Sequence, residues 1–234
     1  MNTFFLVLFS PVKTFGELKT VDKFSAMSLI MLLFLMLLNL ILMIPVSEKI
    51  ALMTFSSMSL PESQLEMMTQ VVHKMRYLQM AGTTIVYLIM FLFYALLLFV
   101  FVRIAQDKLE YKKALQLIVY SYFIIPVGDL INTVLLHVRG LEAITNIYDI
   151  SLTGLTLFTS VEQTGATLYT FLGYINPFQL GFMVLLSIGL KVFADMKQTK
   201  ALIISVLFWL FTILIPTLSV YFAASAAAKA GVMQ

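Results

Sequence analysis

Five long apolar segments with almost no charged side chains constrain the fold of this chain more than any other feature. They are residues 24–46, 81–102, 114–137, 173–193 and 201–224. A helix rises about 1.5 Å per residue, so each segment is long enough to span the roughly 30 Å hydrocarbon core of a bilayer. Only 12% of the residues are charged, about half the share in soluble domains. We predict an all-α, polytopic membrane helix bundle with five transmembrane helices plus short amphipathic helices.

Lysine and arginine residues predict which ends of these spans face the cytoplasm. Ten of the fifteen lie in the N-terminal segment and in the short loops around residues 103–113 and 191–200. The other five are spread over the longer segments on the opposite side. We therefore expect residues 1–23 to form a cytoplasmic amphipathic segment and residues 24–224 the membrane domain. Residues 225–234 are then an outer C-terminal tail.

The N-terminal segment contains a helix start. In Ser10-Pro11, serine is a favoured N-cap and proline is favoured in the first turn. Val12, Phe15 and Leu18 then recur at helical spacing. The predicted helix either lies in the inner membrane interface or packs on the cytoplasmic end of the bundle.

Two segments between the spans also carry structural signals. A helix is expected from about Leu60 to Gln79, and it could run on into the second span. Residues 152–172 are rich in threonine, which argues against an ordinary span. They are expected to be interfacial or re-entrant, and a sixth span is the remaining alternative.

One polar stripe lies inside the third span. Asp129 is the only acidic residue well inside a predicted span, where a charge at a helix centre costs about 2.5–3.5 kcal/mol. Tyr122, Pro126, Asn132 and Thr133 share its helix face by spacing. The stripe is either a proton or substrate site, a contact with a partner's span, or a hydrogen-bonded seam that packs this helix into the bundle.

The sequence lacks the residues that metal, nucleotide-binding and thiol-based catalytic sites require. The chain has no cysteine, and His73 and His137 do not have metal-binding spacing. The 15 methionines are scattered and suit apolar packing. No phosphate-binding loop occurs, and the predicted inner loops are too short for an ATPase domain. We expect no catalytic residues, no metal and no cofactor. The net charge of +3 comes from basic residues that a membrane protein needs to set its orientation, so it does not indicate nucleic acid as a partner.

Several stretches together resemble the bacterial branch of the Yip-domain family, which is named after Ypt/Rab-interacting proteins. Residues 10–15, with Pro11 and Phe15, look like its opening S-P-x-x-[TA]-F segment. Residues 120–126 are similar to its S-Y-x-x-x-P segment. Across the fourth span an N-x-F-x-L…G-L pattern is carried by Asn176, Pro177, Phe178 and Gly189. The D-L-Y-G-P and G-Y-G-x-x-L motifs of the eukaryotic branch are absent.

The resemblance implies a non-enzymatic multi-pass protein of the bacterial inner membrane. Some bacterial relatives sit beside MacAB-like ABC exporters as accessory subunits. The implied partners are the lipid bilayer and other membrane proteins, including the permease, ATPase and adaptor of such an exporter. The alternative function is a small proton- or solute-coupled transporter that uses Asp129. We expect residues 11–19 and 60–79 to be the docking elements.

Overall fold

The structure of the chain is a computed structural model that describes residues 2–21, 26–56 and 62–231. Every regular element within those ranges is a helix, which confirms the predicted all-α bundle. In chain order they are α1 (Asn2–Phe9), α2 (Pro11–Thr20), α3 (Ala26–Leu42), α4 (Ile44–Ser56), α5 (Glu62–Ile104), α6 (Tyr111–Tyr122), α7 (Ile124–Arg139), η1 (Leu141–Ala143), η2 (Leu155–Phe158), α8 (Val161–Thr164), α9 (Ala166–Gly173), α10 (Pro177–Phe193) and α11 (Gln198–Gly231).

Three helical stretches are long and apolar enough to cross a membrane by themselves. They are Met80–Ile104 within α5, Tyr111–Arg139 across α6 and α7, and Gln198–Ala223 within α11. Two more crossings arise if each bent helix pair counts as one span. The pair α3–α4 bends by 47° and the pair α9–α10 by 55°. The described residues therefore provide three to five candidate spans, and five is the number predicted.

Pro126 explains why the third span consists of two helices. Proline has no N–H, so it cannot donate the helical hydrogen bond to the carbonyl of Tyr122. The helix assignment is interrupted at Phe123, whose backbone angles stay helical (φ −53°, ψ −32°). The chain therefore continues as one stretch, Tyr111–Arg139, that is long and apolar enough to cross a membrane, with a local break three residues before Pro126.

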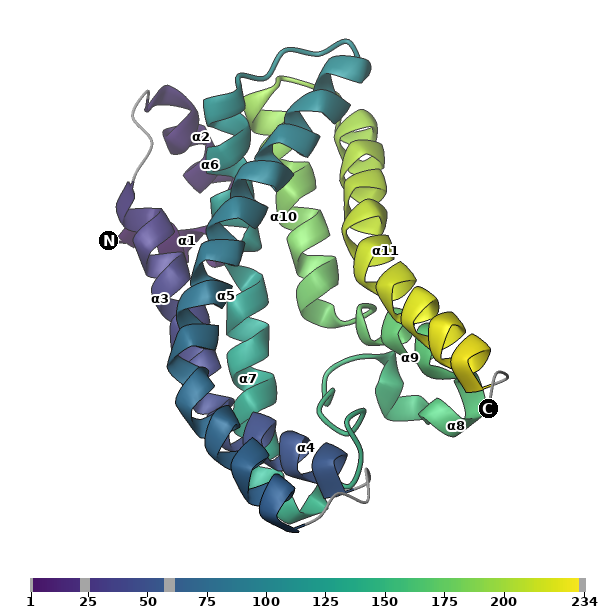
Figure 1. Cartoon of the computed structure of the whole chain (residues 1–234). Helices are drawn as coiled ribbons and strands as arrows, with labels where there is room; N and C mark the ends of the chain where they lie inside the picture. The colour runs from purple at the N-terminus through teal and green to yellow at the C-terminus, as the bar shows by residue number, and fades with distance from the viewer. Residues whose placement is uncertain (1, 22–25, 57–61, 232–234) are drawn as a thin grey trace.

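Helix α10 lies at the centre of the bundle, where it contacts α2, α6, α7 and α11 (Figure 1). Helix α5 lies beside α6, and α3 lies beside α7. Aromatic rings fill the space between α5, α6, α10 and α11. The Tyr122 ring packs edge-on against Phe91 at 5.3 Å and Phe182 at 5.5 Å between centroids. Such pairs each add about 0.5–1.5 kcal/mol beyond area burial.

Two glycines allow α10 to approach its neighbours closely. A β-carbon at Gly189 would overlap the Leu117 side chain of α6 and come within 3.3 Å of the Phe15 ring of α2. A β-carbon at Gly128 of α7 would overlap the Phe178 ring and lie 2.8 Å from its β-carbon. These glycines are needed for their small size, because neither has a positive φ.

Three lysines join the segments that were predicted to be cytoplasmic. The Lys113 ammonium donates to the carbonyls of Lys19 and Val21 at 2.9 and 2.8 Å. Lys19 is paired with Asp195 at 2.6 Å, and Lys200 donates to the Ala105 carbonyl at 2.6 Å. The segments thus meet at one end of the bundle, at the top of Figure 1. We call this the basic end.

Helix α2, the helix predicted in the N-terminal segment, packs on the bundle. Helix α2 begins at Pro11, as Ser10-Pro11 predicts, although the Ser10 side chain makes no capping hydrogen bond. Phe15 and Leu18 are buried against the rest of the molecule, whereas Val12 is 63% exposed. Of the two predicted placements, packing on the end of the bundle is therefore the one observed.

Several predicted boundaries differ from the observed ones. The helix before the second span does run on into it, as the prediction allowed, to form α5, while its predicted start near Leu60 lies outside the described residues. Helix α11 runs on to Gly231, through the predicted C-terminal tail. Residues 152–172 form only short helices, so the sixth ordinary span does not form there.

The gathering of lysines at one end leads to a topology prediction. We expect the basic end to face the cytoplasm, since the basic residues divide ten to five between the two sides. Reporter fusions should place the Asp107–Tyr111 loop inside and the Glu142–Asp149 loop outside, with Gln234 also outside. A cytoplasmic signal at Gln234 would contradict an odd number of spans.

Candidate functional site

A polar cavity of about 420 Å³ lies between α7, the chain that follows it, α9 and the start of α10. It brings together two residues of the predicted stripe, Asp129 and Asn132, with Asn176 of the family-like motif. The residues that line it are Asp129, Asn132, Ile147, Tyr148, Ile150, Ser151, Thr153, Thr156, Tyr169, Thr170, Gly173, Tyr174, Asn176 and Gln179. Small-molecule sites commonly have volumes of about 300–1,000 Å³, so this cavity could hold a ligand.

Asn132 holds the irregular chain that forms one wall of the cavity. Its amide nitrogen donates to the Ile150 carbonyl, and its amide oxygen accepts from the Leu152 N–H, both at 2.8 Å. Asn132 lies seven residues before the end of α7, which is about 10 Å along the helix axis. Non-helical backbone at such a depth is tolerated where it is buried in protein or lines a water-filled cavity.

A tight turn before this wall is closed by Asp149. One of its carboxylate oxygens accepts hydrogen bonds from the Thr145 N–H, the Thr145 hydroxyl and the Asn146 N–H, at 2.8 to 2.9 Å. Partial burial raises the pKa of Asp149, but these hydrogen bonds and the Arg139 charge outweigh it and hold the pKa below its ordinary value. Asp149 is thus a structural carboxylate.

Asn176 starts α10 at the edge of the cavity. Its side-chain oxygen accepts from the backbone N–H groups of Phe178 and Gln179 at 3.1 and 2.9 Å, and Pro177 occupies the first helical turn. Its amide nitrogen donates to the Gly173 carbonyl at 3.0 Å. The Asn-Pro pair therefore begins this helix in the way that an N-cap and a first-turn proline should. The predicted start of the fourth span at residue 173 lies before this helix start.

Asp129 differs from its polar neighbours because its carboxylate makes no hydrogen bond or ion pair with the residues that the structure describes. It lines the cavity together with the Tyr174 phenol. No lysine, arginine or histidine lines the same cavity. The cavity therefore contains one acidic group and no basic group to neutralise it.

The structure separates the other residues of the stripe. The Thr133 hydroxyl is buried against α3, where it donates to the Asn39 side-chain oxygen at 2.6 Å. Tyr122 lies among aromatic rings, and Pro126 is buried at the break between α6 and α7. Thr133, Tyr122 and Pro126 pack the bundle, whereas Asp129 and Asn132 form part of the cavity.

The family-like motif residues also divide between packing and the cavity. Phe15 and Gly189 lie against each other at the basic end, close to Pro11 at the start of α2. Phe178 fills the space over Gly128. Asn176 alone among them lines the polar cavity.

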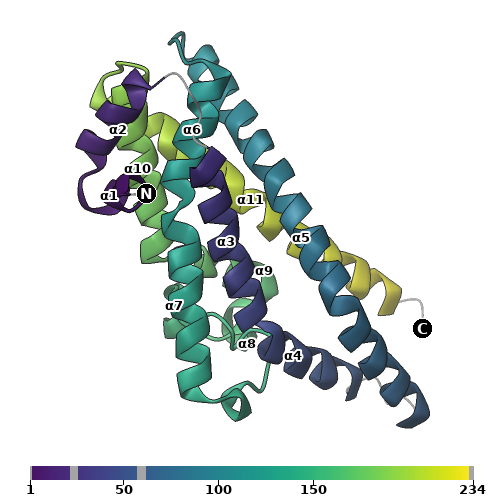
Figure 2. The same ribbon diagram turned by 90° about the vertical axis from the view of Figure 1, so that its left-hand side faces the viewer.

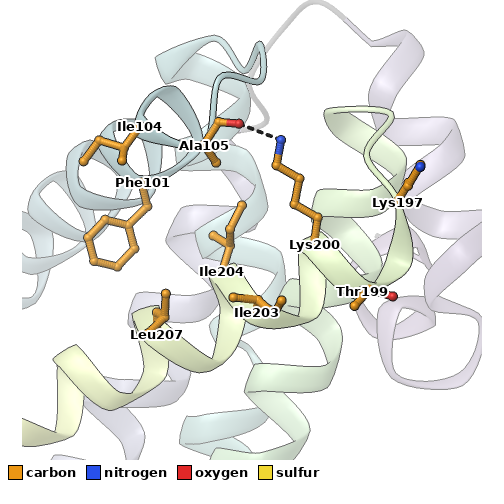
Figure 3. A pocket seen from close by; sticks show the side chains of 9 residues that line it. All are labelled: Phe101, Ile104, Ala105, Lys197, Thr199, Lys200, Ile203, Ile204 and Leu207. Carbon is orange, nitrogen blue, oxygen red and sulfur yellow. Dashed lines mark hydrogen bonds between the residues drawn. The ribbon is translucent and has the colours of Figure 1, made fainter.

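A larger cavity of about 570 Å³ lies at the basic end, between the last turn of α5 and the first turns of α11 (Figure 3). Its walls are mainly the apolar side chains of Phe101, Ile104, Ile203 and Leu207, with Lys200 held at its edge by the Ala105 carbonyl. An apolar surface between membrane helices is covered by lipid chains at no cost. The smaller polar cavity is therefore the candidate functional site.

Sequence reasoning missed most of this site. Tyr148, Tyr169 and Tyr174 line the cavity but belong to no stripe or family-like motif, and Gln179 stands only at an unspecified position of the N-x-F-x-L pattern. The one available signal was the threonine-rich composition of residues 152–172, which supply Thr153, Thr156 and Thr170 to the cavity wall. Among the described residues, no group of three or more histidine, aspartate or glutamate side chains could hold a metal ion.

Comparison with known proteins assigns the chain to a family. A search of curated proteins and a search of solved structures each found no match. Residues 5–220 match the Yip1 domain, which covers nearly all of the helices described above. Members of this family are generally non-enzymatic membrane proteins. This protein, with its three to five candidate spans, therefore belongs to the Yip1 domain family.

Proposed function

We propose that this protein is a non-enzymatic accessory subunit that binds other membrane proteins through an arm formed by α4 and the first part of α5. Figure 2 shows this arm extending away from α7 at the end opposite the basic end. The observation that carries the proposal is a row of exposed apolar side chains on the arm. Met67, Val71, Met75 and Leu78 are between 50% and 66% exposed.

The exposed row lies on the side of α5 that faces away from α4. Successive residues of a helix turn by about 100°, so Met67, Val71, Met75 and Leu78 share one face. Thr69, Val72 and Arg76 lie on the opposite side, where Thr69 and Val72 pack near α4 and Arg76 pairs with Glu48 at 3.6 Å. Helix α4 thus leaves the row uncovered.

This row also precedes the stretch of α5 that can span a membrane, Met80–Ile104. The bilayer core therefore does not cover it if that stretch is the span. An uncovered apolar helix face of this kind suits an amphipathic helix of a partner protein. By contrast, α2, the other predicted docking element, already buries Phe15 and Leu18 within the protein.

A double substitution tests the arm. Val71→Glu with Met75→Glu puts two charges on the row, so we expect co-purification of partner chains in mild detergent to fall at least about tenfold, the effect of 1.4 kcal/mol. Membrane abundance should stay unchanged because neither side chain is buried. Mass spectrometry of the co-purifying chains gives the readout.

Gln70→Glu with Lys74→Gln is the matched control, because it also shifts the net charge by two units. Both side chains are exposed on the same part of α5, outside the row, and should tolerate the change. Equal loss of partners in both double variants would show that the row has no special role. A protein that purifies alone and retains a measurable activity of its own would reject the accessory function.

The partner proposed first is an ABC exporter of the MacAB type in a bacterial inner membrane. The support is the family resemblance together with the short inner loops, which leave no room for an ATPase domain in this chain. The permease, ATPase and adaptor of such an exporter should then co-purify, and their genes should lie next to this one.

A second candidate function is proton- or solute-coupled transport through the polar cavity, which the unpaired carboxylate of Asp129 favours. Asp129→Asn keeps the size of the side chain and removes its charge. If the candidate is right, this variant should reach normal abundance and lose flux in proteoliposomes, whereas Asp129→Leu should also lose abundance. Normal flux with leucine would remove Asp129 from the mechanism.

A further inference from the structure

The polar cavity combines three features that together select a class of ligand: a carboxylate without a partner, aromatic walls and no basic residue. We infer that it binds a small organic cation, such as an alkylammonium ion, with Asp129 as the counter-charge and the ring of Tyr174 as an aromatic contact. This deepens the second candidate function by naming its substrate class, but it concerns binding alone.

The charge of the cavity excludes anions and disfavours neutral ligands. Asp129 is the only ionisable acidic or basic side chain in the lining, apart from the phenols. The Asp129 side chain is exposed on the wall of this cavity, so a cation that enters the cavity can reach its carboxylate. A cation that enters the cavity therefore gains an ion pair that the protein itself does not supply.

The aromatic rings in the lining favour organic cations over metal ions. Metal cations such as Na⁺, K⁺ or Ca²⁺ require several oxygen ligands that are free to coordinate. Here Asn132 and Asn176 use their amide oxygens on backbone N–H groups. The Tyr174 ring lines the same cavity as Asp129, together with the hydroxyl groups of Ser151, Thr153, Thr156 and Thr170 and the amide of Gln179. Aromatic faces attract alkylammonium ions and hold their apolar groups.

The other aromatic wall is preassembled. The rings of Tyr148 and Tyr169 meet edge to face at 5.4 Å between centroids, and the Tyr169 hydroxyl donates to the Tyr148 carbonyl at 3.1 Å. Tyr148 belongs to the chain that Asn132 holds in place, and Tyr169 belongs to α9. A ligand would therefore meet a wall that needs little ordering on binding, which reduces the entropic cost.

Titration of the full chain in maltoside micelles tests this inference, because such micelles contain no competing ammonium group. Tetramethylammonium is the probe, tert-butanol is a neutral molecule of similar shape, and K⁺ is the inorganic competitor. We expect saturable binding of tetramethylammonium by calorimetry, with a matching rise in thermal midpoint. Equal binding of tert-butanol, equal competition by K⁺ or no saturable binding would each overturn the inference.

Variants then assign the binding to the cavity. Asp129→Asn should lower the affinity at least tenfold, whereas Glu162→Gln, which removes an exposed carboxylate on α8, should leave it unchanged. Unchanged affinity in Asp129→Asn would overturn the inference. Tyr174→Phe keeps the ring and should bind as before, while Tyr174→Leu should lose about two- to thirtyfold, the range of one cation–π contact. If Asp129→Asn does not accumulate, equal affinity of the two Tyr174 variants overturns the assignment.

Flux measurements keep this inference separate from the transporter candidate. Tetramethylammonium that binds but does not cross proteoliposomes would reject transport and leave the binding site standing. Proton flux through a protein that binds no ammonium ion would support transport and overturn the inference.

Discussion

Gly128→Ala is expected to lower the stability of the bundle strongly, although it adds only one methyl group. The added β-carbon would overlap the Phe178 ring and lie 2.8 Å from the Phe178 β-carbon, so rotation of the ring alone cannot relieve the clash. Helices α7 and α10 must move apart, and overpacking of this kind typically costs about 1–3 kcal/mol. The measurement is the thermal unfolding midpoint of the purified protein in one detergent, where we expect a fall of several degrees.

Gly82→Ala is the control for this prediction. Gly82 lies in α5 with no atom within 4 Å of the position of a new β-carbon, so alanine there should be neutral or stabilising. The double variant Gly128→Ala with Phe178→Leu should recover part of the loss, because the smaller side chain makes room. Equal midpoints for Gly128→Ala and the wild-type protein would show that the close approach of α7 and α10 is not required.

Asn132→Leu is expected to release the irregular wall of the cavity. The substitution removes two hydrogen bonds and leaves the Ile150 carbonyl and the Leu152 N–H without their partner. Each unsatisfied group costs about 1–3 kcal/mol when it is buried. We therefore expect this part of the chain to open locally, while the helices stay folded.

Cysteine labelling can measure this opening because the natural chain has no cysteine. A single Thr153→Cys reporter should react with a maleimide at least about tenfold faster in the Asn132→Leu background, since tenfold corresponds to 1.4 kcal/mol of opening free energy. The control background is Gln163→Leu, an exposed position on α8. An unchanged rate in Asn132→Leu would show that the wall is held by other contacts.

Local sequence signals account for two of the observed helix limits. The interruption at Phe123 follows from the missing N–H of Pro126, and the start of α2 at Pro11 follows from Ser10-Pro11. The same reasoning applied to Asn176-Pro177 would have placed the start of α10 correctly. These features depend on residues within one helical turn of each other, which is why composition and order suffice.

The candidate site was predicted only in part because its walls come from distant segments. Periodicity placed Asp129, Asn132 and Thr133 on one face, but a helix face is wide enough to contact two neighbours. Thr133 meets Asn39 of α3, while Asn132 meets residues 150 and 152. No pattern within the third span indicates which neighbour each side chain will meet.

The sequence by itself therefore determined that this protein lies in a membrane and that its long apolar segments are helices. Long apolar segments must be helical in a membrane because each helix satisfies its own hydrogen bonds, and this requirement does not depend on neighbours. Only the tertiary structure decided which polar groups find partners. The return of residues 147–156 against α7 satisfies Asn132 and leaves the Asp129 carboxylate facing the cavity, since hydrogen bonding between segments depends on where the packed helices place them.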